Sequence, residues 1–243
     1  MKTNANSIII ALAVIISAFL FSDAFKKRNQ SNDTISVTGL GKKDFVSDLI
    51  VWSGSFSRKS FTLKEAYAAL DTDRENIKKY LTSKGIGADE IVFSAVNFNK
   101  DFQTTYNENG TMREQVFTGF TLTQNVSIQS KNVNKIEEIS RQSSELINSG
   151  IEFYSNAPEY YYTKLAELKI KMIAEATKDA QTRAKSIAEN AGADLGNLKK
   201  SDMGVFQITG QNSSEDFSYG GSFNTSSKNK TANITVKLVY QVD

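Results

Sequence analysis

The sequence predicts an α+β fold: two ferredoxin-like β-α-β halves (split βαβ) followed by a long helix and a C-terminal β-hairpin. Apolar and polar residues alternate in several short runs, as in half-buried strands, and three longer stretches carry apolar residues at helical spacing. The order strand, helix, strand occurs twice in succession, which is the split βαβ arrangement. The first two helices also end in similar segments, at residues 81–86 and 146–151. An internal duplication and ordinary helix-stop chemistry explain this similarity about equally well.

The first predicted strands flank a short segment that contains glycine. Residues 35–39 alternate between apolar and polar side chains and start a strand, and Gly39 and Gly41 predict a turn after it. Residues 49–57 form the next predicted strand, because they are rich in apolar β-branched and aromatic side chains.

The first helix of the fold begins at a capping box. Thr62 and Glu65 have the spacing at which each side chain accepts a hydrogen bond from the other's free backbone amide. Gly85 ends the helix, since the left-handed conformation common at a helix C-terminus favours a residue without Cβ. The apolar stripe of this helix consists of Leu63, Ala66, Tyr67, Leu70, Ile77 and Leu81.

The second strand–helix–strand unit follows directly. Residues 91–98 and 116–128 are predicted strands, and Asn109-Gly110 predicts a hairpin tip between them because this pair tolerates positive φ. Residues 133–148 form the next predicted helix, which ends at Gly150. Its inward-facing residues are Val133, Ile136, Ile139 and Leu146.

The longest predicted helix covers residues 164–191, and its apolar stripe is narrow and dominated by alanine. Small side chains permit close approach of a neighbour, which is either another copy of the chain or the protein's own sheet. Residues 198–208 and 232–242 form the final strand pair. The segment 209–230 between them is rich in Ser, Asn and Gly with few apolar residues, which predicts a mobile loop.

The N-terminal segment has the character of a targeting sequence. Residues 8–21 are apolar apart from Ser17, and a helix of this length reaches about 21 Å, short of the ~30 Å hydrocarbon core of a bilayer. Such a length fits the apolar region of an export signal. We therefore expect residues 1–24 to be a signal peptide or an N-terminal membrane anchor with a transmembrane helix. A linker, 25–33, and one α+β domain, 34–243, follow.

The composition excludes most of the common catalytic chemistry. The 243-residue chain has no histidine and no cysteine, which rules out a Ser-His-Asp triad, a thiol nucleophile, disulfides, and His or Cys metal ligands. Its 29 basic and 27 acidic residues give a net charge of +2, which is too balanced for a protein that binds nucleic acid through counterion release. We expect no nucleic-acid partner, no cofactor and no metal site.

Two residual catalytic patterns and one possible calcium loop each lack the context that their chemistry needs. Ser227 and Lys230 form a Ser-x-x-Lys pattern, but they lie in the polar loop and not at a rigid helix start. Glu175 and Asp179 lie one helical turn apart among basic residues, as on a solvated helix face. Residues 71–75 look like a calcium loop without its glycine or its final glutamate. We expect no catalytic residues, and the alternative is a hydrolase that uses two carboxyl groups.

Two groups of aromatic residues are candidate contact sites for a ligand or another subunit. The first group surrounds Pro158, where core packing or strand alternation is the competing explanation. The second lies in the segment 209–230, where a mobile loop would not bury every ring. The candidates are Tyr160, Tyr161, Tyr162, Phe217, Tyr219 and Phe223.

Several motifs occur in a recognisable order. The segment ISVTGLG at residues 35–41 precedes an apolar strand that contains Trp52, and Gly119-Phe120 opens a later strand. An alanine-periodic helix is then closed by Ala191-Gly192. In this order the chain resembles, from residue 34 to residue 243, the SIMPL-domain family, long described as a domain of unknown function.

The resemblance implies a bacterial cell-envelope protein that faces the periplasm, either anchored in the inner membrane or exported. It also implies large ring-like homo-oligomers, a link to envelope stress and no established catalytic residues. We therefore expect a non-enzymatic protein that self-associates, with the membrane as a further partner if residues 1–24 are retained. The alternative is an envelope ligand-binding or sensing module for a small molecule or glycan, with a groove near residues 160–162.

Overall fold

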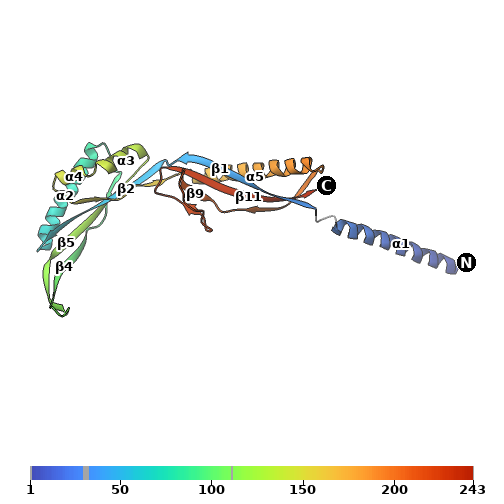
Figure 1. The fold of residues 1–243 in the computed structure, drawn as a ribbon, viewed down its shortest axis with the longest axis horizontal. Coiled ribbons are helices and arrows are strands. Elements are labelled where there is room, and N and C mark those ends of the chain that lie inside the picture. Colours follow the sequence, from blue (N-terminus) through green and yellow to red (C-terminus); the bar gives the residue numbers. More distant parts are fainter. Residues whose placement is uncertain (1, 30–32, 111, 243) are drawn as a thin grey trace.

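The computed structural model describes residues 2–29, 33–110 and 112–242. The chain is elongated: two lobes lie end to end, one a β-sheet with several helices and the other a β-sheet with one long helix, and helix α1 (Lys2–Asn29) precedes them (Figure 1). Residues 49–161 form the ferredoxin-like lobe, and residues 34–46 together with 165–242 form the long-helix lobe. The predicted α+β class is confirmed, as is the long helix followed by C-terminal strands.

The ferredoxin-like lobe contains both predicted β-α-β halves in a single antiparallel sheet. Its strands lie in the order β3-β5-β2-β6, with β4 also paired to β5 and β7 to β2. Helix α2 connects strand β2 to strand β3, and β5 lies between these two strands in the sheet. This is the split βαβ arrangement. The elements are β2 (Leu49–Ser60), α2 (Leu63–Ser83), β3 (Ile91–Phe93), β4 (Asn97–Tyr106), β5 (Met112–Ser130), α3 (Val133–Gln142), α4 (Glu145–Asn148), β6 (Phe153–Ser155) and β7 (Glu159–Tyr161).

The long-helix lobe joins the first strand of the domain to the last. Strand β11 pairs with β1 along the whole of β1, and on its other side with β8 and β9. The two predicted C-terminal strands are therefore present as an antiparallel pair, and β1 lies beside them. The elements are β1 (Thr34–Val46), α5 (Leu165–Asn190), β8 (Leu195–Met203), β9 (Gln207–Gly210), β10 (Ser222–Phe223) and β11 (Asn229–Val242).

The turn predicted at Gly39 and Gly41 is wrong, because both glycines lie inside strand β1. They lie under α5: a Cβ on Gly39 would be 2.1 Å from the backbone oxygen of Ala176, and one on Gly41 would be 2.5 Å from that of Met172. The helix backbone can approach the strand this closely only because no side chain separates them. The alanine stripe of α5 is therefore buried within the chain, with Ala176, Ala180, Ala184 and Ala188 each 0% exposed.

The ferredoxin-like lobe is packed with larger side chains. Thr62 caps α2 by accepting a hydrogen bond from the backbone N–H of Glu65 at 3.3 Å, and Gly85 follows the helix with φ +81°, both as predicted. The other half of the predicted capping box is replaced: the backbone N–H of Thr62 donates to the Ser60 hydroxyl, which in turn donates to the Glu65 carboxylate at 2.7 Å. Leu63 and Tyr67 of the predicted stripe are exposed instead. The predicted helix 133–148 is divided into α3 and α4. The largest fully buried apolar side chains of this lobe are Ile50, Trp52, Phe56, Leu70, Ile77, Leu81, Ile128, Ile136 and Ile151.

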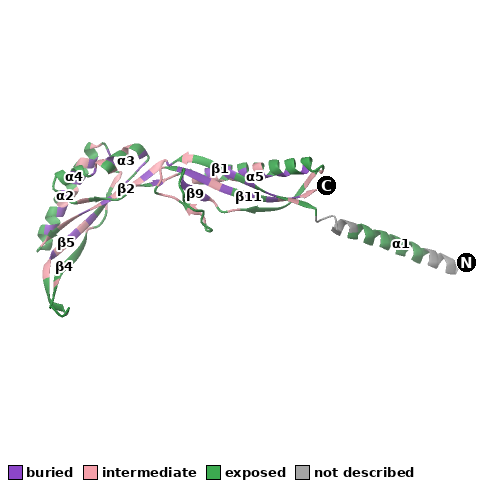
Figure 2. Cartoon of the chain, viewed as in Figure 1, coloured by how far each residue is buried: buried purple, intermediate pink, exposed green. Residues whose placement is uncertain are grey.

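Burial follows the two sheets and stops at both ends of the molecule. Figure 2 shows buried residues along the sheet of each lobe and exposed residues on α1 and at the far end of β4 and β5.

The expected transmembrane helix is not found: among the helices in the described residues, none is long and apolar enough to cross a membrane.

The segment 209–230 is hydrogen-bonded to the side chain of Gln207 in β9. Strand β10 pairs with β9 in parallel. The side-chain oxygen of Gln207 accepts hydrogen bonds from the backbone N–H of Ser218 at 3.2 Å and of Ser222 at 3.0 Å. The Gln207 side-chain amide also donates to the Ser218 carbonyl at 2.7 Å. These bonds fasten the segment to the sheet at two points, while its mobility stays a prediction.

Candidate functional site

Two of the carboxylates singled out in the sequence, Asp179 and Asp73, have structural partners. Asp179 on α5 accepts hydrogen bonds from the backbone N–H of Leu40 and from Nε of Arg183, each at 2.9 Å, and both bonds lower its pKa. Asp73, inside α2, is 3% exposed and binds Arg58 through both oxygens, at 2.5 and 2.9 Å. In the part of the chain that the structure describes, no three His, Cys, Asp or Glu side chains are grouped to hold a metal ion.

The Ser-x-x-Lys pattern lies where β11 begins, and its lysine is deeply buried. Lys230 is 1% exposed, and its Nζ donates hydrogen bonds to the backbone and side-chain oxygens of Asn224 at 2.5 and 3.3 Å. Burial lowers the pKa of Lys230 to about 8. Both bonds go to Asn224, so Lys230 holds the start of β11 against an earlier part of the segment 209–230.

The three tyrosines near Pro158 have different environments. Tyr160 is 7% exposed and belongs to the core of the ferredoxin-like lobe, so the expectation that its ring forms a contact surface is corrected. Tyr161 lies beside Phe223, with ring centroids 6.4 Å apart, and its hydroxyl donates to Glu159 at 2.8 Å. Tyr162 packs on Phe45 with ring centroids 4.8 Å apart. The structure thus links the two predicted aromatic groups through Tyr161 and Phe223.

The remaining two candidates line a shallow groove on the sheet of the long-helix lobe. Phe217 is 65% exposed and Tyr219 is fully exposed. They border a groove of about 380 Å³ together with polar side chains from β9 and β11. Its lining residues are Leu40, Val205, Gln207, Phe217, Ser218, Tyr219, Asn233, Ile234 and Thr235.

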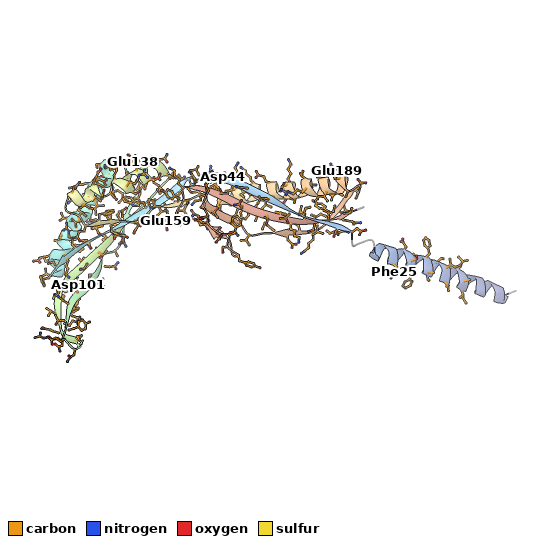
Figure 3. The ribbon with its side chains drawn as sticks, in the orientation of Figure 1. Phe25, Asp44, Asp101, Glu138, Glu159 and Glu189 are labelled. Atoms are coloured by element: carbon orange, nitrogen blue, oxygen red, sulfur yellow. The ribbon has the colours of Figure 1, made fainter. Side chains whose placement is uncertain are left out.

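A second exposed apolar surface lies on the hairpin of β4 and β5, which sequence reasoning missed. Strand β2 pairs with β5 only as far as Ser60 opposite Phe120, so residues 112–119 of β5 pair with β4 alone. Beyond that point the sheet continues as a two-stranded ribbon, which we call the arm. Figure 3 shows the side chains of the arm projecting into solvent beyond Asp101.

Register places the apolar side chains of the arm on one face. Phe98 pairs with the buried Leu122, Phe102 with Phe117, and Tyr106 with Met112, and residues directly opposite each other share a face. The register shift between Asp101 and Phe102 adds one residue to β5, which brings Phe117 onto the same face as Phe120; their ring centroids are 5.0 Å apart.

This face is the continuation of the core face of the sheet. Helix α2 begins at Leu63, and past its first turn no described helix covers the arm. Most of the apolar side chains there are exposed: Phe61 by 68%, Tyr106 by 65% and Met112 by 61%. We call this surface the arm strip, and it consists of Phe61, Phe98, Phe102, Tyr106, Met112 and Phe117.

One sequence signal could have revealed the arm strip. Phe98, Phe102 and Tyr106 are spaced by four residues, so all three fall on one face of an extended strand. The predicted strand ended at residue 98, and its continuation to Tyr106 brings the three rings into line.

Comparison with known proteins identifies the family. A family model described as SIMPL, a protein of unknown function (DUF541), matches residues 35–240. No curated protein matches the chain. The matched range begins in β1 and ends in β11, so it includes both lobes and the arm. The chain therefore belongs to the SIMPL (DUF541) family, as the order of its motifs predicts.

Proposed function

We propose that this protein is a non-enzymatic cell-envelope protein that works by binding further copies of itself through the arm. The arm strip is the observation that carries the proposal. An isolated two-stranded ribbon is marginally stable in water, and a contiguous exposed apolar face is typical of an interaction site. A partner that covered the arm strip would complete the core face that α2 leaves open.

A second copy of the chain suits this surface best. The outer edge of β4 has no strand partner in the described chain, and an unpaired edge is a template for adding another strand. Asp101, at the base of the arm, already pairs with Lys59 of the same chain at 2.8 Å. Charges of both signs nevertheless lie on the arm and beside its base, with Arg113 and Glu114 on β5 and Lys100 on β4. Two copies can pair these charges with each other, whereas an anionic polymer or membrane would favour a single sign.

The cellular location rests on the sequence. The apolar run at residues 8–21 has the length of an export signal, and the envelope location facing the periplasm is what the resemblance to the SIMPL-domain family implies. A chain without histidine and cysteine also has few groups suited to catalysis at neutral pH. We therefore assign the function of this protein to binding through its surfaces and not to catalysis.

Light scattering of the purified full chain in detergent tests the proposal. We expect a mass several-fold above the 26.9 kDa of one chain. The double substitution Phe102→Ser and Tyr106→Ser should reduce it to that of one chain, because it removes two rings from the arm strip. The matched control, Phe217→Ser with Tyr219→Ser, removes two exposed rings elsewhere and should leave the mass unchanged. A wild-type monomer at micromolar concentration would contradict the proposal.

The groove beside Phe217 and Tyr219 favours a second candidate function, the binding of a small molecule or glycan of the envelope. The exposed rings of Phe217 and Tyr219 lie in this groove next to the polar side chains of Asn233 and Thr235, and an apolar surface with a few polar groups is typical of a small-molecule site. Thermal-shift screening with envelope glycans tests this function. A shift that Tyr219→Ala removes and Tyr106→Ala retains would support it, and the absence of any shift would oppose it.

A further inference from the structure

A polar pocket of about 480 Å³ lies where the two lobes meet. The chain passes from β1 to β2 at its wall, and the first turn of α3, the start of α5 and the segment before β11 complete it. Its lining residues are Val46, Ser47, Asp48, Lys131, Asn132, Val133, Asn134, Thr163, Lys164 and Lys228. The pocket therefore takes groups from both lobes.

The charged groups that line this pocket are mainly cationic. Lys131 and Lys164 have no ion pair or hydrogen bond through their side chains within the described residues. Lys228 donates to Asn134 at 2.5 Å and to Glu137 at 2.9 Å. Because two of the three ammonium groups are uncompensated, the pocket favours an anion.

The carboxylate in the wall is already occupied. Asp48 accepts hydrogen bonds from the backbone N–H and the hydroxyl of Thr163, both at 2.7 Å. These two bonds join the start of β2 to the segment before α5. Asp48 therefore holds the wall in place, and its negative charge is partly satisfied.

Helix α3 presents its N-terminus to the same pocket. Asn132 caps the helix by accepting from the backbone N–H of Lys135. The first amides of a helix have no intrahelical acceptor, and those of Val133 and Asn134 have none elsewhere in the described chain. Backbone N–H groups in this position, together with the helix dipole, attract anions.

An orphan hydroxyl gives an independent indication of a ligand. Ser47 is 4% exposed, and its Oγ is buried without a hydrogen-bond partner among the described residues. Leaving a buried polar group unpaired costs about 1–3 kcal/mol, and native proteins seldom do so without a reason. Ser47 lies in the wall of the pocket, and its backbone N–H donates to the carbonyl of Lys228 at 2.9 Å.

We propose that this pocket binds a phosphate group. The lysine ammonium groups and the free amides of α3 supply the charge and the donors that a phosphate accepts, and the Ser47 hydroxyl, buried in the wall beside them, has no other acceptor within the described residues. The group is either a free phosphate ester or the headgroup of a lipid. Since the donors come from both lobes, the bound phosphate fixes one lobe against the other and stabilises the folded chain. The proposal is independent of self-association through the arm.

Titration calorimetry and thermal unfolding of the full chain with inorganic phosphate test the free form. We expect saturable binding and a rise in Tm with phosphate concentration. Lys131→Ala with Lys164→Ala should weaken binding at least tenfold. The control Lys78→Ala with Lys199→Ala removes the same charge from exposed positions outside the pocket and should leave binding unchanged. Equal weakening by both pairs would mean non-specific charge attraction and would overturn the proposal.

Ser47→Ala separates a ligand group from a structural one. The substitution removes the orphan hydroxyl, so Tm without phosphate should stay the same or rise, while the shift caused by phosphate should shrink. If Ser47→Ala left the phosphate shift intact, the hydroxyl would have no part in the site.

Vesicles of phosphatidylcholine with and without phosphatidylglycerol test the lipid form. Binding to the anionic vesicles that requires Lys131 and Lys164, without binding of inorganic phosphate, would identify a lipid headgroup. If neither probe binds, the proposal fails.

Discussion

The two lobes cover the apolar faces of their sheets in opposite ways. In the long-helix lobe, α5 runs along β1 and β11, and alanine meets glycine so closely that the helix backbone touches the strand. In the ferredoxin-like lobe, α2 and α3 pack through large side chains, and the sheet extends beyond them into the arm. The alanine stripe of α5 is therefore fully buried against the sheet, whereas the aromatic side chains of the arm strip are not covered by any described element.

The proposed self-association surface lies on the arm and not on the alanine stripe of α5. The small side chains of the alanine stripe on α5 allow close packing, and the element that packs against them is β1 of the same chain. The stripe cannot bind a second copy while the lobe is folded. The arm strip has no such neighbour in the described chain, so its aromatic side chains are the ones free to contact a second copy.

The largest expected effect on stability comes from adding a side-chain atom between α5 and β1 in the long-helix lobe. Gly39→Ala places a methyl group 2.1 Å from the backbone oxygen of Ala176, so helix and strand must separate. We expect a loss of more than about 3 kcal/mol in the free energy of unfolding, at the upper end of overpacking costs. Urea denaturation of the variant measures it.

Gly220→Ala is the matched control for that experiment. A Cβ on Gly220 would meet no heavy atom within 4 Å, so its free energy of unfolding should change by less than about 0.5 kcal/mol. Equal losses in the two variants would show that the contact between α5 and β1 is not close.

The ferredoxin-like lobe should be sensitive to the opposite change, the removal of volume. Ile77 on α2 is 0% exposed, and Ile77→Ala leaves a cavity that the surrounding large side chains fill only in part. We expect a loss of about 3 kcal/mol in the free energy of unfolding. Ile170→Ala, at a position that is 69% exposed on α5, should cost far less, and urea denaturation compares the two.

Local rules predicted much of the fold. Thr62, Gly85 and Gly150 act on their own helix ends, so neighbouring residues alone identify them. The roles of Gly39 and Gly41 depend on α5, more than a hundred residues later, and no local pattern distinguishes a turn glycine from one beneath a helix. The sequence placed the surface aromatics in the segment 209–230, but the arm strip depends on where β2 stops pairing with β5.

Some candidate site residues could likewise be predicted from their neighbours in the sequence, and others depend on the tertiary fold. Tyr219 was predictable because a polar segment cannot bury it, whereas Tyr160 alternates into the core. The pocket between the lobes was not predictable, since Ser47, Lys131 and Lys164 are separated along the chain and meet only through the tertiary fold.

A smaller effect concerns Lys230, whose burial sets a pH dependence in the long-helix lobe. Its pKa in the folded chain is about 8, below the ordinary value of 10.5, so the unfolded chain binds more protons between these values. Stability should therefore rise with pH in this window, by about 2 kcal/mol between pH 8 and pH 10. Lys230→Met should remove this rise and the exposed control Lys237→Met should keep it, as followed by urea denaturation at each pH.

The smallest expected effect is the loss of a ring from the arm strip. Tyr106 is 65% exposed, so Tyr106→Ser in the monomeric protein removes little buried area and should change the free energy of unfolding by less than about 0.5 kcal/mol. The same substitution should weaken self-association, because there the ring becomes buried against a partner. Urea denaturation at high dilution and light scattering at micromolar concentration measure the two quantities separately. A stability loss as large as that of Ile77→Ala would mean that the arm is part of the core, and the contrast between a closed and an open apolar face would disappear.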